Sequence, residues 1–367
     1  MKIKNKKICF FNSCIAWGGG EKWYRDTAIQ LSQRKYKIIF LANQKSELYG
    51  KMKNEKVDLY HMNVSNLSFL NIKKIIKLIG IFKSENIDTV ILNLPSDLKL
   101  AGIASKLAGV RKVVYRRGSA IPINNTILNK FLLKNCVTDI VANSETTKKT
   151  LLKNTSKWLN EEKIKVIYNG INLEEINEKK WSPVYQRKGN EIILGNAGRL
   201  NKQKGQKYLI DIAVELQKRN LEFKILIAGT GDLEDKLKQY AKERKVSNNV
   251  IFLGFVENIK SFMMSIDVFL LTSLWEGFGY VMVEAMASKK VVMAFDVSNI
   301  SEIITENKTG YLIEDFNIKK MCNKIESLNK QRKLMDEMGK EGYKKVEKKF
   351  LINKAVMNLI EMIEFNK

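Results

Sequence analysis

Two glutamates eight residues apart mark the stretch of this chain that is best suited to chemistry. Glu276 follows an apolar run, 268–272, that has the length of a buried strand, and Glu284 lies in a segment, 281–287, with small residues at helical spacing. The sequence therefore predicts that Glu276 lies in a strand-to-helix loop and Glu284 about two turns inside the helix. At about 1.5 Å rise per residue, Glu284 would lie within roughly 12 Å of the loop.

The residues between the two glutamates suit a polyhydroxyl ligand that carries phosphate. Gly277 and Gly279, on either side of Phe278, let the backbone approach a ligand closely, and a helix start offers N–H groups to an anion. The carboxylates can accept hydrogen bonds from sugar hydroxyls. The alternative is a surface helix whose two glutamates face water, and the spacing alone does not decide between them.

Arg199 and Lys204 form a candidate clamp for a diphosphate. They lie five residues apart, next to Gly198 and Gly205, and follow the apolar run 192–194. A guanidinium fork and an ammonium group together suit the oxygens of a diphosphate. The alternative is a solvated loop, because two more lysines are close by.

Apolar runs of strand length alternate with helical patterns in both halves of the chain. Continuous apolar strands separated by helices predict parallel sheets covered on both faces. We therefore predict an α/β protein of two doubly wound, Rossmann-like domains that face each other, with ligands at the carboxyl ends of the strands. The predicted strands are 8–11, 37–41, 89–92, 112–115 and 139–142, then 192–194, 223–227, 250–253, 268–271 and 291–294. The predicted helices lie near 20–33, 71–84, 97–109, 125–135 and 144–153, then near 205–219, 232–245, 258–265 and 277–288.

The segment 273–288, SLWEGFGYVMVEAMAS, resembles the retaining glycosyltransferases of sequence family four, whose pattern is E-G-F-G…E-A-M-A with seven residues between the glutamates. The resemblance runs from about residue 8 to about residue 350 and is most specific in the second half. Further matching pieces are NAGRL at 196–200 with QKGQ at 203–206, AGTG at 228–231, VIYNGI at 166–171 and GGGE at 18–21.

The resemblance implies the GT-B fold, with the active site in the cleft between the domains and a last helix that crosses back to the first domain. The predicted domains are 1–173 on the acceptor side, with 351–367 crossing back, and 191–350 for the nucleotide sugar, joined by a polar linker, 174–190. In this resemblance Arg199 and Lys204 neutralise the leaving nucleoside diphosphate, Glu276 binds hydroxyls of the donor sugar, and Glu284 binds the ribose. The remaining donor-binding positions are Gly19, Gly198, Gly229, Gly231, Gly277, Phe278 and Gly279.

The sequence departs from the family after a strand in the middle of the first half. Many members carry a histidine near the donor sugar there, whereas this chain has Arg116 and Arg117, which become candidates for binding a phosphate or an acidic sugar on the acceptor side. The only histidine, His61, lies at the end of a probable strand and is interpreted as structural. No D-x-D sequence is present to hold a metal ion, so we expect no metal and no cofactor, only a nucleoside-diphosphate sugar as co-substrate.

Composition bounds the remaining possibilities. The 367 residues fit two domains, and no run of eighteen apolar residues predicts a membrane span. Four cysteines without C-x-x-C spacing, and a start that does not resemble a signal peptide, predict a reduced, cytosolic chain. Residues 1–180 hold 33 Lys and Arg against 15 Asp and Glu, so an anionic partner such as a lipid surface is plausible; neutral drift in composition is the alternative.

The segment 71–83 has apolar residues at helical spacing between lysines. Such a helix either packs its apolar stripe on the sheet, which we favour, or lies on the inner face of an anionic membrane. We predict a metal-independent retaining glycosyltransferase that acts on a cell-envelope glycan or glycolipid acceptor. A GT-B enzyme with a small soluble acceptor is the alternative, and a nucleic-acid-binding protein is a remote one, because the lysines are not interleaved with aromatic residues.

Overall fold

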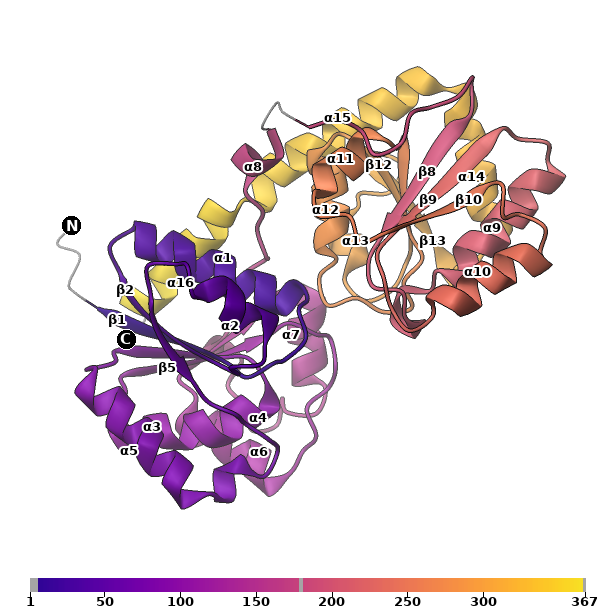
Figure 1. The fold of residues 1–367 in the computed structure, drawn as a ribbon. Helices are drawn as coiled ribbons and strands as arrows, with labels where there is room; N and C mark the ends of the chain where they lie inside the picture. The colour runs from indigo at the N-terminus through magenta and orange to yellow at the C-terminus, as the bar shows by residue number, and fades with distance from the viewer. Residues whose placement is uncertain (1–5, 178–180, 366–367) are drawn as a thin grey trace. The chain divides into compact units, whose positions relative to one another are not determined.

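The computed structural model describes residues 6–177 and 181–365 and divides the chain into two compact units. Unit 1 comprises residues 1–170 and 352–367, and unit 2 comprises residues 171–351. Figure 1 shows the ribbon of each unit. Each unit is a parallel sheet with helices on both faces, so the predicted fold class is confirmed.

Unit 1 is built on a seven-stranded parallel sheet with the order β3-β2-β1-β4-β5-β6-β7. Its central strands are buried along almost their whole length, as expected for a sheet covered on both faces. The strands are β1 (Lys7–Asn12), β2 (Lys37–Ala42), β3 (Asp58–His61), β4 (Thr89–Leu92), β5 (Lys112–Arg117), β6 (Asp139–Ala142) and β7 (Ile164–Val166).

Helices connect these strands, and several begin at a side-chain cap. The Ser144 hydroxyl accepts a hydrogen bond from Thr147 N at 3.0 Å, and the Asn71 side chain accepts one from Lys74 N at 3.1 Å. The α-helices are α1 (Gly19–Gln33), α2 (Glu47–Met52), α3 (Ile72–Ser84), α4 (Pro95–Asp97), α5 (Ile103–Ala108), α6 (Ile127–Phe131) and α7 (Glu145–Leu152). Shorter helical turns are η1 (Ser68–Leu70), η2 (Leu98–Gly102), η3 (Leu132–Cys136) and η4 (Glu161–Lys163).

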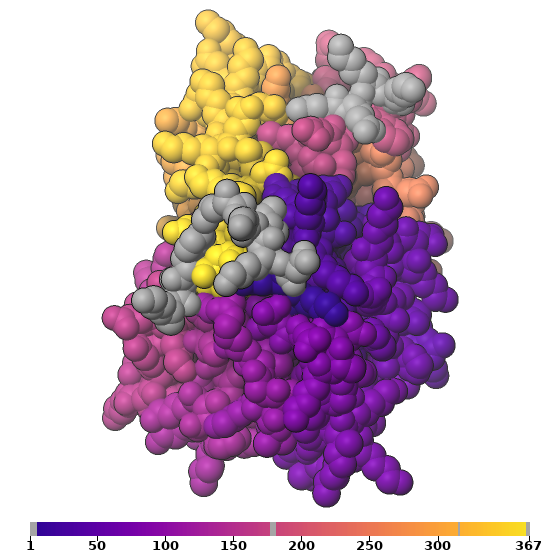
Figure 2. Space-filling view, turned by 90° about the vertical axis from the view of Figure 1, so that its left-hand side faces the viewer, coloured from indigo at the N-terminus to yellow at the C-terminus, as the bar shows by residue number. Residues whose placement is uncertain are grey.

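The last helix of the chain, α16 (Ile352–Phe365), completes unit 1 by packing against α1. Lys112 Nζ donates a hydrogen bond to Met362 O at 2.7 Å, and Tyr36 Oη donates one to Glu364 at 3.2 Å. Glu364 also forms an ion pair with Lys6, so the two ends of the described chain lie side by side (Figures 1 and 2). The chain thus leaves unit 1 after residue 170 and returns to it after residue 351.

Unit 2 repeats the plan with a six-stranded parallel sheet in the order β10-β9-β8-β11-β12-β13. The strands are β8 (Ile192–Ala197), β9 (Phe223–Ala228), β10 (Val250–Gly254), β11 (Val268–Leu271), β12 (Val291–Phe295) and β13 (Gly310–Ile313). The helices are α8 (Leu173–Asn177), α9 (Lys207–Lys218), α10 (Glu234–Glu243), α11 (Ile259–Met264), α12 (Tyr280–Ala287), α13 (Ile300–Ile303), α14 (Ile318–Lys330) and α15 (Arg332–Lys349), with the turns η5 (Lys202–Lys204) and η6 (Glu314–Phe316).

The polar segment that we predicted as a linker, 174–190, belongs to unit 2. In its described part Val184 N donates a hydrogen bond to Ser261 O at 3.4 Å, and Tyr185 N donates one to Ser265 Oγ at 3.1 Å. Polar composition suggested a free connection, but these backbone groups find partners on α11. Residues 178–180 lie outside the described part of the chain.

Each sheet has one point at which the strand order reverses. In unit 1 this point lies between β1 and β4, and in unit 2 between β8 and β11. Loops that follow these strands diverge to opposite faces of the sheet and leave room for a ligand at the carboxyl edge. Gly19 follows β1, and Arg199, Lys204 and Glu276 follow β8 and β11, whereas Arg116 and Arg117 end β5.

Candidate active site

An ion pair joins the loops that follow β8 and β11 in unit 2. Lys204 Nζ lies 2.6 Å from Glu276 Oε1, and the side chains are 20% and 4% exposed. The structure therefore brings together two of the three residues predicted to be catalytic. An ammonium group has three donors, so Lys204 can hold Glu276 and still donate to a phosphate.

Two serines hold the loop that carries Glu276. Ser273 Oγ donates a hydrogen bond to Glu276 Oε1 at 2.6 Å, and Ser298 Oγ accepts one from Glu276 N at 3.1 Å. Ser298 comes after β12 and has a φ of +54°, in the left-handed region that favours glycine. The glutamate thus has a fixed backbone and a carboxylate held by a cation and a hydroxyl.

Three glycines allow the backbone around this pair to pack closely. A Cβ at Gly229 (φ +133°) would lie 2.0 Å from Gly198 O, and one at Gly205 (φ +61°) would lie 2.2 Å from Thr272 O. A Cβ at Gly231 would lie 2.4 Å from Leu200 O. These close contacts hold the loops after β8, β9 and β11 against one another, and we call these packed loops the floor of the site. Three of the glycines predicted to bind the donor, Gly198, Gly229 and Gly231, take part in this packing.

Arg199 lies in the same loop as Lys204 and is exposed. Its carbonyl oxygen accepts a hydrogen bond from Gln206 Nε2 at 3.1 Å, which closes the loop between the two basic residues. Both predicted clamp residues therefore stand at the carboxyl edge of the sheet of unit 2, next to its reversal point.

The predicted helix start at Gly277 is wrong, because α12 begins at Tyr280. Gly279 has a φ of +83°, which a helix cannot contain, and its carbonyl accepts the first hydrogen bond, from Met282 N at 3.0 Å. Glu284 is therefore about one turn inside the helix rather than two, and it is partly buried. Phe278 is buried against the rings of Tyr280 and Phe350 and anchors the loop.

In unit 1 a cluster of polar side chains lies at the reversal point between β1 and β4. Gly19 begins α1 there, and Glu21, 7% exposed, accepts hydrogen bonds from the side chains of Asn12 at 3.3 Å and Asn93 at 3.5 Å. The matching piece GGGE at 18–21 includes Glu21, but the sequence analysis indicated neither Asn12 nor Asn93. An Asn after each of two adjacent apolar runs was the available signal.

Arg116 is buried beside this cluster. Its Nη2 donates a hydrogen bond to Asn169 Oδ1 at 3.1 Å, and its guanidinium lies 4.5 Å from the centre of the Trp23 ring. A Cβ at Gly20 would lie 4.0 Å from Arg116 Nη1, and one at Gly118 only 2.6 Å. Gly118 therefore gives this guanidinium its room, whereas a side chain at residue 20 would only touch it.

Arg117 differs from its neighbour, because both terminal nitrogens of its guanidinium donate hydrogen bonds inside the unit. Nη1 donates a hydrogen bond to Tyr115 Oη at 3.3 Å, and Nη2 donates one to Ile121 O at 2.5 Å. His61 is exposed at the end of the edge strand β3, away from the reversal point.

Asp97, which the sequence did not indicate, ties the loop after β1 to the loop after β4. Its carboxylate accepts hydrogen bonds from Leu94 N at 3.1 Å and Ser13 N at 3.3 Å, and from Ser13 Oγ. Burial raises the pKa of this carboxyl group to about 7, although the hydrogen bonds oppose the shift. It supports the loop that leads to the Gly18–Gly20 turn.

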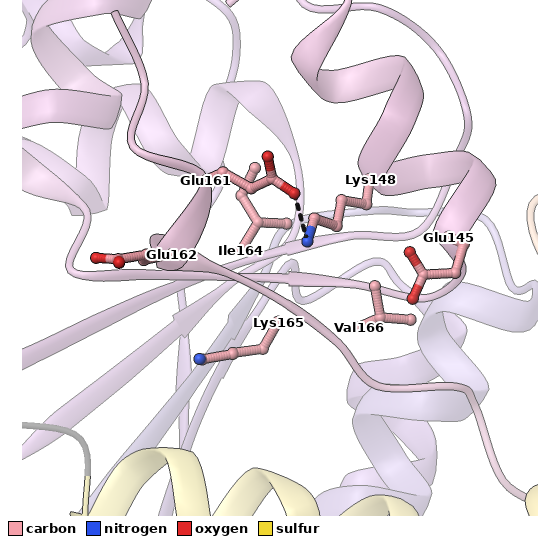
Figure 3. Close-up of a pocket in the computed structure, with 7 residues that line it drawn as sticks. All are labelled: Glu145, Lys148, Glu161, Glu162, Ile164, Lys165 and Val166. Atoms are coloured by element: carbon pink, nitrogen blue, oxygen red, sulfur yellow. Dashed lines mark ion pairs between the residues drawn. The ribbon is translucent and has the colours of Figure 1, made fainter. Parts of the chain in front are cut away.

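A separate hollow of about 590 Å³ lies at the edge of the sheet of unit 1. Figure 3 shows that its rim carries charges of both signs, and Lys148 Nζ pairs there with Glu161 at 2.8 Å. None of the predicted site residues lines it. Within residues 6–177 and 181–365, no three His, Cys, Asp or Glu side chains are grouped so that they could hold a metal ion.

Two family models match the chain, one on each half. Glycosyltransferase Family 4 matches residues 17–175, and Glycosyl transferases group 1 matches residues 177–345. The chain belongs to the family-four glycosyltransferases. The resemblance carried by the E-G-F-G…E-A-M-A segment is thus confirmed.

Two curated relatives illustrate the family. The capsular polysaccharide biosynthesis glycosyltransferase CapM of Staphylococcus aureus is 30% identical over 59% of this chain and 58% of its own. The UDP-Gal:alpha-D-GlcNAc-diphosphoundecaprenol alpha-1,3-galactosyltransferase of Escherichia coli is 26% identical over 79% of both chains. This chain spans about half the length of the curated relatives that it matches at 29–36% identity.

A solved structure extends the similarity to the whole fold. A glycosyltransferase from Rickettsia africae superposes with a TM-score of 0.88 and 21% identity, covering 99% of this chain and 100% of that one. This similarity shows the GT-B fold, with a parallel-sheet α/β domain in each unit. In the described residues no helix is long and apolar enough to span a membrane.

Proposed function

We propose that this protein transfers a sugar from a nucleoside-diphosphate sugar, with retention at the anomeric carbon, to a cell-envelope glycan or lipid-linked acceptor. The observation that carries the proposal is the Lys204–Glu276 pair at the carboxyl edge of the sheet of unit 2. It sets a cation for the diphosphate directly beside a carboxylate for the sugar.

Charge grows on the diphosphate as the bond from its oxygen to the anomeric carbon breaks. A cation that meets this growing charge lowers the barrier, because it binds the transition state more strongly than the ground state. Lys204 and Arg199 stand next to the glycine-packed floor and are assigned this role. Because the sequence has no D-x-D motif, we propose that they replace a divalent metal ion.

Glu276 is assigned to the hydroxyls of the donor sugar and Glu284 to the ribose. The Ser273 hydroxyl and the Lys204 ammonium orient the first carboxylate. A carboxylate that is already hydrogen-bonded and largely buried is a poor nucleophile, so we propose a binding role rather than a covalent one for Glu276.

The acceptor is inferred from the relatives and from charge. The relatives named above act, by their names, on a capsular polysaccharide and on a sugar linked to diphosphoundecaprenol. Arg116, whose guanidinium has room because residue 118 is a glycine, is proposed to meet an anionic group of such an acceptor. A small soluble acceptor on the same fold is the second candidate.

Three measurements test the proposal. A thermal-shift screen of nucleotide sugars identifies the donor, and transfer with that donor is then followed in the presence of EDTA. We expect turnover to persist in EDTA and the product to keep the donor's anomeric configuration. Loss of turnover in EDTA with recovery in Mn²⁺ would refute metal independence, and an inverted product would refute retention.

A further inference from the structure

Helices α3, α5 and α6 form one layer on a face of the unit 1 sheet, with the turns η1, η2 and η3 between them. Figure 1 shows the three helices together on the side of the sheet opposite α1 and α16. We call this layer, residues 67–84, 98–108 and 127–136, the lysine face. It takes no part in the site described above.

The charge of the lysine face is of one sign. Residues 59–84 and 98–138 contain no Asp or Glu at all. The helices and turns of the face carry eight lysines: Lys73, Lys74, Lys77, Lys83, Lys99, Lys106, Lys130 and Lys134. Composition alone would scatter both signs, as it does on α15 of unit 2, so the absence of acids over two long segments is a property of this face.

Large apolar side chains project into solvent among these lysines. Ile127 is 90% exposed and Ile72 is 70% exposed, whereas a folded chain usually exposes such residues singly. Two lysines lie over aromatic rings, with Lys106 Nζ 5.5 Å from the centre of the Phe131 ring. The other large apolar residues exposed on the face are Leu67, Leu70, Ile76, Leu107 and Phe131.

The apolar residues of α3 fall into two groups, one packed in or against the core of unit 1 and one exposed to solvent. Leu78 and Phe82 are buried in the core of unit 1, with Ile75 and Ile79 packed against it. Ile72 and Ile76 remain exposed on the outer side. The packing favoured from the sequence therefore accounts for only part of the apolar stripe.

We infer that the lysine face docks on an anionic phospholipid bilayer, with the exposed Ile, Leu and Phe side chains inserted among the headgroups. Lysines attract the surface and apolar side chains enter the boundary of the acyl chains, which is the combination that interfacial helices use. A second copy of the chain would set eight lysines against eight lysines in a two-fold contact, which is repulsive. The purpose of docking rests on the proposed lipid-linked acceptor; the docking itself is measured without it.

The test is flotation of the full chain with vesicles of phosphatidylcholine alone and with added phosphatidylglycerol, at low and high salt. We expect binding only to the anionic vesicles, weakened by salt. The triple variant Lys73→Gln, Lys74→Gln, Lys77→Gln should bind about 100-fold more weakly, because each basic residue near the surface contributes about 1 kcal/mol and about 1.4 kcal/mol is a factor of ten.

The matched control is Lys35→Gln, Lys53→Gln, Lys56→Gln, which removes the same charge from the other side of unit 1 and should keep most of the affinity. The variant Ile127→Ser, Phe131→Ser should lose the part of the binding that survives high salt. Equal losses for both triple variants, or no flotation of the unaltered chain at low salt, would overturn the inference.

Three further readouts separate this inference from its rivals and from the proposed function. Duplex DNA that competes with anionic vesicles for the unaltered chain but not for the lysine-face triple variant would reassign the face to nucleic acid. Dimers in sedimentation velocity that Ile127→Ser, Phe131→Ser abolishes would reassign it to a second copy. Nucleotide-sugar binding measured by calorimetry should be the same in all variants, so failure to float with intact donor binding would sink only the docking.

Discussion

Replacing Lys204 by Met isolates the Lys204–Glu276 ion pair. Met keeps most of the aliphatic stem, which a Cβ at residue 198 would meet at 3.5 Å, but it leaves a carboxylate that is only 4% exposed without its cation. Breaking a buried pair by removing one partner costs about 3–5 kcal/mol. Because Glu276 keeps the Ser273 hydrogen bond and Lys204 is partly exposed, we expect a loss of about 2–3 kcal/mol.

The double variant Lys204→Met, Glu276→Gln removes the pair without leaving a buried charge. It should be more stable than the sum of the single changes predicts, with a coupling of about 2 kcal/mol. About 1 kcal/mol shifts Tm by roughly 2–4 °C in a unit of this size, so Lys204→Met should lower Tm by about 4–12 °C. All three variants should lose turnover, because the cation or the sugar-binding carboxylate is gone.

Thermal unfolding of the full chain, followed by circular dichroism, gives the four corners of this cycle. Lys202→Met, an exposed lysine two residues earlier in the same loop, is the control and should leave Tm within about 2 °C. Additive changes in Tm would show that the two side chains do not interact in solution. The argument for a prearranged cation and carboxylate would then fail.

Three other changes test neighbouring parts of the structure. Glu284→Ala should weaken donor binding in calorimetry by about 1.5–3 kcal/mol with Tm unchanged, and unaltered affinity would remove its ribose role. Ser298→Gly and Ser298→Ala should each weaken donor binding, because the hydrogen-bond acceptor for Glu276 N is lost. Only the glycine variant should keep or raise Tm, because glycine adopts the left-handed φ of residue 298 without strain. Equal losses of Tm in the two variants would contradict this. The pKa of Asp97 is raised in the folded chain to about 7, so the contribution of its protonated form to stability is fully present below about pH 4 and is lost as the pH rises through 7. The variant Asp97→Asn should therefore gain stability relative to the unaltered chain between pH 5 and pH 8. A difference in Tm between the two proteins that does not change with pH would argue against an ionising carboxyl group.

The strands could be predicted from the sequence because buried parallel strands are continuous apolar runs. The ten predicted strands all exist, with ends displaced by at most two or three residues. The strand predicted to end at His61 also exists, as β3 (Asp58–His61), whereas β7 and β13 were not predicted, since these edge strands are only three and four residues long. The helix start at Gly277 failed for a different reason, because a left-handed glycine is invisible in a pattern of apolar residues.

The residues of the candidate site likewise fall into those that the sequence could indicate and those that it could not. Glu276 and Lys204 could be singled out because their spacing repeats a family pattern, and the structure adds the ion pair between them, which spacing could not predict. Ser298 and Asp97 could not be found, because each acts through a partner that is distant in the sequence, Glu276 and Ser13. Long-range hydrogen bonds of single serines and aspartates leave no periodic signal.

The return of α16 to unit 1 has a consequence for synthesis on the ribosome. Unit 2 is one continuous segment and can fold as soon as it has emerged, but unit 1 lacks α16 until residues 352–365 are made. At about 5–20 residues per second, the 181 residues of unit 2 take roughly 10–40 s to translate. During that interval the surface of α1 that α16 covers is exposed on the nascent chain, so unit 1, although its translation starts before that of unit 2, is completed after it.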